Sequence, residues 1–338
     1  MTFPGSAAQA APRRAVLLSS HLGTIRTVSK AFGAAGVETR LAGALDELGN
    51  AQSEIDLAVV DLDAEPKLDG EALVGAAHRW CPHAELMVVA GRDARRRLTA
   101  VLAAAQVAHA LPKAPPSLPS DDFDGPDERD LFVALRRRAT AEVPLFAGIA
   151  PYLAGAASVH ELLLQSTDEK EAAVGAVVAL AERMLLQGEL LRRIELVAEE
   201  LVMNALFDAP VDESGRRRYA SLERSTRVVL ADHERVRLRY GCDGRAFAVS
   251  VADPFGALRR ETVTEHLHRA LAPGGARPSH RGGGASVGLL LAFAAANQLV
   301  FSVEPGVCTE VTAVIDVAGG NRASLQRGTS VHFYEASA

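Results

Sequence analysis

The sequence has few of the residues that build disulfides, metal centres or membrane spans. Its three cysteines, Cys81, Cys242 and Cys308, form no C-x-x-C pair and have no metal-ligand spacing, which favours a reducing compartment. No apolar run reaches about 20 residues, so we expect no segment to span a bilayer. The first dozen residues are rich in Ala and Pro and lack the apolar core of a secretory signal. These absences predict a cytoplasmic protein without a membrane partner.

An excess of positive charge is also missing. The 36 Lys and Arg residues face 42 Asp and Glu residues, a formal net charge of -6, so there is no electrostatic case for nucleic acid as a partner. We interpret the arginine triplets at 95–97, 136–138 and 216–218 as solvated faces rather than a phosphate-binding patch. The length of 338 residues predicts two domains.

The clearest break in the chain is the stretch KAPPSLPSDDFDGPDERD at 113–130, which is rich in proline, serine and acids and typical of a linker. It divides the chain into the following predicted parts: an N-terminal domain at 13–115, a linker and helical connector at 116–157, a second domain at 158–318, and a C-terminal tail at 319–338.

Short apolar runs alternate with helical patterns before this linker. Strands are predicted at 14–20, 55–63, 84–91 and 107–113, with helices at 23–36, from the end of the second strand through Arg79, and at 93–105. Because the runs are apolar on both faces, they predict a parallel sheet with helices on both sides.

Three features of this half resemble the receiver domain of bacterial response regulators. Asp61 ends an apolar strand, Pro66 and the Asp69-Gly70 pair resemble the turn that follows it, and Lys113 ends the last strand in LPK. The resemblance covers 13–115 and implies an α/β, receiver-like, doubly wound parallel sheet. It places Asp61 at the phosphoacceptor position and Lys113 beside it. Without the resemblance, Asp61 is an ordinary acid at the carboxyl end of a strand.

The other receiver groups are replaced. Ser19, Ser20 and His21 stand where receivers carry the acids that hold Mg²⁺, and Ala90 stands where they carry a hydroxyl. Mg²⁺ prefers carboxylate oxygens, and without it nothing neutralises the charge of phosphoryl transfer. We therefore predict a pseudo-receiver that serves protein interaction or dimerisation.

The second half predicts an α+β sandwich with helices on one face of a mixed sheet. A strand at 159–167, helices at 168–187 and 189–207, and the hairpin RVRLRYGCDGRAFAVSVAD are followed by an apolar helix at 287–297 and two final strands, LVFSVEPG and TEVTAVIDV.

Three patterns in this half could carry chemistry. Glu200 and Asn204 share a helix face at i, i+4, where an amide oxygen could bind Mg²⁺ and a carboxylate could act on a nucleophile; a solvent-facing pair is the alternative. Asp253 ends a strand, with Gly256 in the following turn, and could accept a hydrogen bond from an exocyclic amine; an acid beginning a Pro-containing turn is the alternative. The third is the stretch RGGGASVGLLLA at 281–292, which could cradle a phosphate or form a surface turn.

The order of these patterns resembles the GHKL ATPases over about 158–318, most closely the anti-sigma-factor serine kinases. The resemblance implies a GHKL (Bergerat-type) sandwich that binds ATP and Mg²⁺. It assigns Asn204 to Mg²⁺, Glu200 to the base or its orienter, Asp253 to the adenine amine, Gly256 to close approach of the nucleotide, Gly282, Gly283, Gly284 and Gly288 to a lid over the phosphates, and Thr309 to support of adenine recognition. Phe255 and Ser286 stand where the family has glycines.

Two functions follow from these patterns. The first is a bacterial signalling regulator that binds ATP and phosphorylates or sequesters a protein partner, docked through the pseudo-receiver. The second is a non-catalytic scaffold in which both domains serve assembly. His160 lies on a predicted strand instead of a dimerisation helix, which speaks against autophosphorylation on histidine, and a homodimer is left open.

Overall fold

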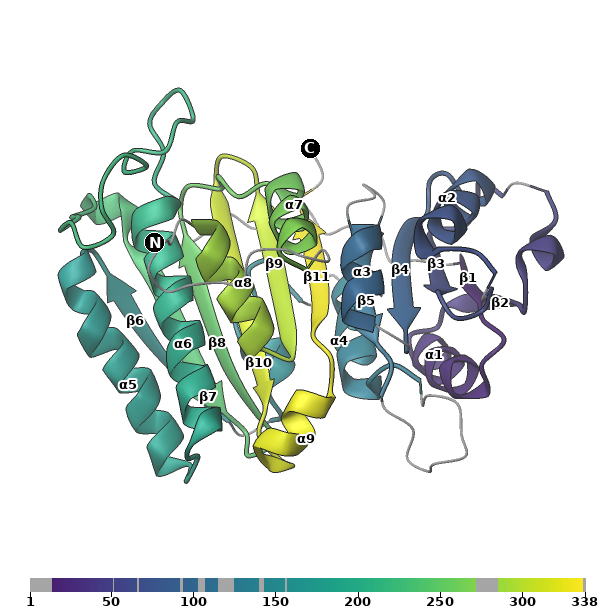
Figure 1. The fold of residues 1–338 in the computed structure, drawn as a ribbon, viewed down its shortest axis with the longest axis horizontal. Coiled ribbons are helices and arrows are strands. Elements are labelled where there is room, and N and C mark those ends of the chain that lie inside the picture. Colours follow the sequence, from purple (N-terminus) through teal and green to yellow (C-terminus); the bar gives the residue numbers. More distant parts are fainter. Residues whose placement is uncertain are drawn as a thin grey trace.

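One sheet runs through the whole molecule. The computed structural model describes residues 14–50, 52–65, 67–91, 94–102, 107–114, 125–139, 143–155, 157–271 and 285–336. Within these ranges eleven strands form a single sheet in the order β2-β1-β3-β4-β5-β11-β9-β10-β8-β7-β6 (Figure 1). The fold is mixed α/β, with parallel strands at one end and mainly antiparallel strands at the other.

The N-terminal half is a doubly wound unit. Its elements are β1 (Arg14–Leu18), α1 (Leu22–Ala34), β2 (Glu38–Ala42), the short 3₁₀ helix Leu45–Leu48, β3 (Leu57–Asp61), α2 (Gly70–Trp80), β4 (Glu85–Ala90), α3 (Ala94–Leu102) and β5 (Val107–Pro112). The four strands predicted from the sequence are confirmed, because each is an apolar run buried on both faces. Strand β2 was not predicted, since ETRLA lies at the sheet edge and is largely exposed.

Helices cover both faces of this unit. α2 and α3 pack together on one side, while α1 packs against α4 (Glu128–Ala139) on the other. Phe32 and Val28 of α1 share a core with Leu131 and Leu135 of α4. The helix that the sequence assigns to the connector therefore completes the second helical layer of the N-terminal unit.

The C-terminal half contains β6 (Ser158–Leu164), α5 (Lys170–Arg183), α6 (Glu189–Met203), a π turn (Asn204–Asp208), β7 (Val236–Cys242), β8 (Ala246–Asp253), α7 (Arg260–Leu271), α8 (Ala285–Ala295), β9 (Gln298–Glu304) and β10 (Cys308–Asp316). Helices α5, α6 and α8 lie side by side on one face of the sheet (Figure 1). They are amphipathic or apolar segments whose buried residues join the main core.

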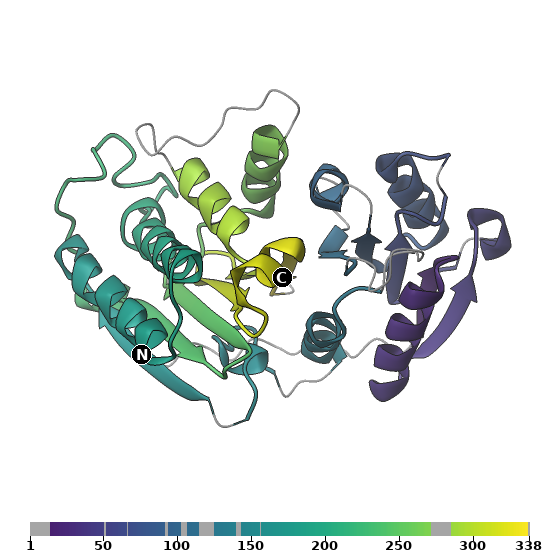
Figure 2. The same ribbon diagram turned by 60° about the horizontal axis from the view of Figure 1, so that its bottom comes forward.

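The opposite face of these strands is also covered. Ile149 and Tyr152, from the chain that follows α4, pack with Val133 of α4 against Val300 and Val314 of the sheet. Figure 2 shows α4 between the two halves on this side of the sheet. The expected layout with helices on one face is thus correct for α5, α6 and α8, and the connector supplies the second layer.

The predicted C-terminal tail is not a tail. Residues 319–336 form α9 (Gly320–Gln326) and β11 (Ser330–Glu335). Strand β11 pairs with β9 in parallel and with β5 in antiparallel orientation, so it joins the two halves. Its first five residues are buried, because strands flank both of its edges. No helix in the described ranges is long and apolar enough to cross a membrane.

Candidate functional site

A pocket opens between the sheet and helices α6, α7 and α8 of the C-terminal half. Its walls are mainly apolar, and the side chains that form them include Leu201, Ala205, Val251, Leu258, Val263, Leu289, Phe301 and Val311. Three predicted site residues also line it: Asn204 at the end of α6, and Asp253 and Thr309 on the sheet. Asp253 and Thr309 come from β8 and β10, which pair antiparallel so that Thr309 lies directly opposite Asp253.

Asp253 and Thr309 are the buried polar groups of this pocket. Asp253 is 5% exposed and Thr309 is 3% exposed. Burial raises the pKa of Asp253 to about 7, although the backbone amides of Phe255 and Gly256 donate to its carboxylate. Among the described residues the Thr309 Oγ1 has no hydrogen-bond partner. A buried hydroxyl without a partner is costly, so this pair can receive a ligand with both a donor and an acceptor.

Gly256 shapes the turn beside this pair. Its φ is +55°, and a Cβ atom there would lie 2.3 Å from the carbonyl oxygen of Glu304 and 2.5 Å from the amide nitrogen of Val307. The amide of Gly306 donates to the Gly256 carbonyl at 3.1 Å. Gly256 therefore allows close approach between two protein turns, whereas the resemblance assigned it to a nucleotide.

The predicted pair of Glu200 and Asn204 does lie together, and the side chain of Arg224 contacts both residues. Arg224 Nη1 lies 3.3 Å from Glu200 Oε2, and Arg224 Nη2 lies 3.2 Å from the amide oxygen of Asn204. Arg224 Nη2 also bonds Asp208. Burial raises the pKa of Asp208, and Arg224 only partly offsets this effect. Asp208 and Arg224 were not singled out from the sequence, although Asp208 stands four residues after Asn204 on the same helical turn.

This arrangement does not fit a bound Mg²⁺. One side-chain oxygen each of Glu200, Asn204 and Asp208 contacts the guanidinium, which is a cation itself. No cluster of three or more His, Cys, Asp or Glu side chains able to hold a metal occurs in the part of the chain that the structure describes. We therefore derive no step through a metal ion.

Gly288 belongs to helix α8 and packs against α6. A Cβ atom at this position would come within 2.2 Å of Glu200 Oε2 and 3.3 Å of Asn204 Oδ1. The glycine thus lets the two helices approach at the Glu200 and Asn204 pair. The three glycines Gly282, Gly283 and Gly284, predicted to form a lid, lie outside the described residues.

The residues of the predicted pseudo-receiver site come together in a closed ionic cluster. Asp61 is fully buried; its Oδ2 accepts from the Ser19 hydroxyl at 2.6 Å and its Oδ1 lies 2.8 Å from Lys113 Nζ. His21 Nδ1 lies 3.3 Å from the same carboxylate. Both carboxylate oxygens are therefore engaged inside the protein. Pro66, one of the anchors of the resemblance, lies outside the described residues.

Asp63 extends this cluster and was missed by the sequence analysis. It lies 3.0 Å from Lys113 Nζ, pairs with Arg97, and accepts from the Gly91 amide at 2.8 Å. Burial alone would raise the pKa of Asp63, but Lys113, the Gly91 amide and Arg97 together hold it below its usual value. One lysine thus serves two carboxylates, which stabilises the ionised form of the cluster.

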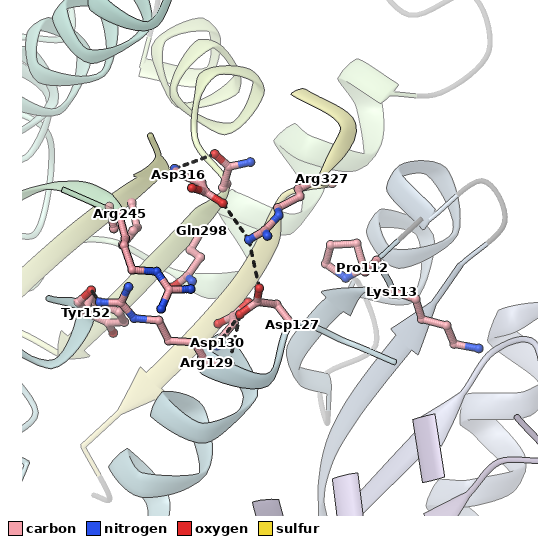
Figure 3. A pocket seen from close by; sticks show the side chains of 15 residues that line it. Pro112, Lys113, Asp127, Arg129, Asp130, Tyr152, Arg245, Gln298, Asp316 and Arg327 are labelled. Atoms are coloured by element: carbon pink, nitrogen blue, oxygen red, sulfur yellow. Dashed lines mark hydrogen bonds and ion pairs between the residues drawn. The ribbon is translucent and has the colours of Figure 1, made fainter. Parts of the chain in front are cut away.

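A second pocket lies at the junction of the two halves and shares no lining residue with the first. Figure 3 shows Arg327 between Asp127 and Asp316, with its Nη1 at 3.1 Å and 2.7 Å from the two carboxylates. The side chain of Lys113 runs away from this pocket toward Asp61 (Figure 3). The two ion pairs of Arg327 link the residue before α4 to the end of β10, so we interpret this pocket as part of the junction.

Compared with protein-family models and with curated proteins, the chain matches neither a family nor a characterised relative.

Proposed function

We propose that the C-terminal half binds an adenine nucleotide and that the protein is a nucleotide-responsive signalling regulator. The observation that carries this proposal is the pairing of two buried polar residues, Asp253 and Thr309, in a pocket whose walls are mainly apolar. An ionised Asp253 can accept a hydrogen bond from the exocyclic amine of adenine. The Thr309 hydroxyl, which has no partner among the described residues, can donate to a ring nitrogen.

The apolar walls fit the flat faces of a purine ring. Such pockets use a few convergent polar groups to set orientation and specificity. Adenine is favoured over guanine because the amine of adenine and the carbonyl of guanine occupy the same ring position, and a carboxylate repels a carbonyl. The resemblance to GHKL ATPases assigns the same two residues to adenine, and it supports the proposal independently of the pocket.

We propose binding, not phosphoryl transfer, as the activity of this site. Glu200, the expected base, already contacts the Arg224 guanidinium, so the oxygen that would take a proton is paired with a cation. The N-terminal half would then act as a docking module for a protein partner, because Asp61 is fully buried and both of its oxygens already have partners inside the protein. Phosphorylation of a partner serine or threonine remains the alternative, and a purely structural scaffold is the second alternative.

Calorimetric titration of the full chain with ADP and with GDP tests the proposal. Two matched variants sharpen the test because both remove a threonine hydroxyl from β10. Thr309→Val removes the buried hydroxyl without a partner, whereas Thr312→Val removes one that donates to Ser250 at 3.0 Å. Burying an unsatisfied polar group costs about 1–3 kcal/mol, so Thr309→Val should leave the free protein as stable as the wild type or more so.

The expected result is ADP binding that Thr309→Val weakens about tenfold, the loss of roughly one hydrogen bond. Thr312→Val should lower the melting temperature and leave the affinity unchanged. Binding of GDP as tight as that of ADP, or no binding of either nucleotide by the wild type, would overturn the proposal.

A further inference from the structure

The guanidinium of Arg224 holds the place at which a divalent cation would join Glu200 to Asn204. We propose that Arg224 replaces the metal in this site, so that adenine nucleotides bind as metal-free anions. This inference rests on the proposed nucleotide site and departs from what the resemblance implies, which is binding together with Mg²⁺.

The contacts of Arg224 reach one side-chain oxygen of each of the three residues that could bind a metal here. Its two terminal nitrogens reach Glu200, Asn204 and Asp208, and its side chain is 24% exposed. Mg²⁺ needs near-octahedral oxygen ligands at about 2.0–2.1 Å, so it could enter only after the guanidinium leaves. A guanidinium stays protonated at every pH that a protein tolerates. The positive charge in this place is therefore permanent.

This charge stands next to the pocket. Asn204 and Asp208 line the same pocket as Asp253 and Thr309, and Arg217 lines it as well. Arg224 thus contacts two residues of the pocket wall, and Arg217 adds a second guanidinium beside Asp208. Guanidinium groups bind phosphate oxygens with charge-assisted hydrogen bonds.

One hydrogen-bond donor of Arg224 is also available for a ligand. Its Nε atom is buried and has no hydrogen-bond partner among the described residues. Buried donors are nearly always satisfied in proteins, so a phosphate oxygen is a chemically suitable partner for this N–H. The same side chain can then neutralise the two carboxylates and contact the ligand.

The chain offers a matched control for a charge-removing variant. Arg216 lies in the same connecting segment between α6 and β7 as Arg224, but it is exposed and pairs with Asp212 within its own turn. Arg216→Met and Arg224→Met remove the same charge and keep a similar side-chain length. Only the second removes the cation from Glu200 and Asn204.

Two measurements test the inference. Electron paramagnetic resonance of Mn²⁺ with the nucleotide-free full chain reports whether the site takes a metal. Calorimetry with ADP, in excess Mg²⁺ and in excess chelator, reports whether nucleotide binding needs one. We expect the wild type and Arg216→Met to leave Mn²⁺ free and to bind ADP with an affinity that changes less than about twofold between the two conditions.

Arg224→Met should instead bind Mn²⁺ at the vacated carboxylates and gain about tenfold in ADP affinity when Mg²⁺ is present. If the wild type binds ADP only with Mg²⁺, the inference is wrong and the proposed function stands. If the wild type binds ADP under neither condition, the proposed function is wrong. In that case, binding of Mn²⁺ by the wild type would overturn the inference as well. Binding of Mn²⁺ by Arg224→Met alone would support the part of the inference that places Arg224 where a metal would bind.

Discussion

The Nδ1 atoms of His109 and His332 lie 3.0 Å apart in the buried seam where β5 meets β11. His109 Nε2 faces Glu85 Oε1 at 2.9 Å, and His332 Nε2 faces Asp130 Oδ1 at 2.9 Å. A hydrogen bond between two Nδ1 atoms needs a proton on one and a lone pair on the other. This hydrogen bond across the seam therefore exists only while one of these rings is neutral.

Acidification should loosen this seam. Burial lowers the pKa of His109, although Glu85 acts in the opposite direction; Arg138 pairs with Glu85, and the Tyr334 ring lies 5.1 Å from His109. For a histidine whose folded pKa is lowered, stability is full above the unfolded value of 6.5 and is lost as the pH falls. Amide exchange of 330–335, corrected for its intrinsic pH dependence, should show less protection at about pH 5 than at about pH 7.5.

The matched variants are His332→Gln, which removes one of the two facing rings, and His160→Gln, which changes a ring stacked on Tyr240 at the far edge of the sheet. The loss of protection on acidification should shrink in the first and persist in the second. An equal loss in both would mean that other groups control the seam.

Nucleotide affinity should rise with pH through Asp253. Burial raises the pKa of this carboxyl to about 7, and the ionised form is the stronger hydrogen-bond acceptor for an amine. Affinity for ADP should therefore be about tenfold higher at pH 8 than at pH 6.

The stability of the free protein should change with pH in the opposite direction. The contribution of Asp253 to the free energy of unfolding is full below the pKa of 3.8 that this carboxyl has in the unfolded chain, and it is lost as the pH rises through about 7. Calorimetry across this pH range checks the affinity, and Asp253→Asn should flatten both profiles. A wild-type affinity that does not change with pH would contradict this role.

Two glycines on neighbouring turns should respond very differently to alanine. Gly256 and Gly306 both have positive φ, but only at Gly256 would a Cβ atom meet backbone, at 2.3 Å from Glu304 O. Gly306→Ala should cost about 1–2 kcal/mol of backbone strain, and Gly256→Ala should exceed this by at least about 2 kcal/mol. Urea unfolding of both variants measures the difference. Equal losses would show that the two turns are not packed together as described.

Loss of Lys113 should be far more damaging than loss of a surface lysine. Lys113→Met leaves the buried carboxylates of Asp61 and Asp63 without their shared cation, and breaking a buried ion pair costs about 3–5 kcal/mol. Lys30→Met removes an exposed pair with Glu128 and should cost less than about 1 kcal/mol. Adding Asp61→Asn to Lys113→Met should recover part of the loss in urea unfolding. Equal costs for the two lysines would be inconsistent with a closed cluster.

Local patterns in the sequence predicted the parts of this molecule that depend on neighbouring residues. Strands buried on both faces, such as β3, are continuous apolar runs, and the helix period of α6 puts Glu200 and Asn204 on one side. The same local logic failed at β2, because an exposed edge strand needs few apolar residues.

Only the tertiary structure decided what surrounds those residues. Arg224 lies 20 residues beyond Asn204 in a segment without periodicity, so no spacing rule places its guanidinium between Glu200 and Asp208. Thr309 faces Asp253 because β10 pairs with β8 in one register. His332 reaches His109 across 223 residues because β11 lies between β5 and β9 in the sheet. Such contacts depend on how the whole chain closes on itself, and that information is not present in any short stretch of the sequence.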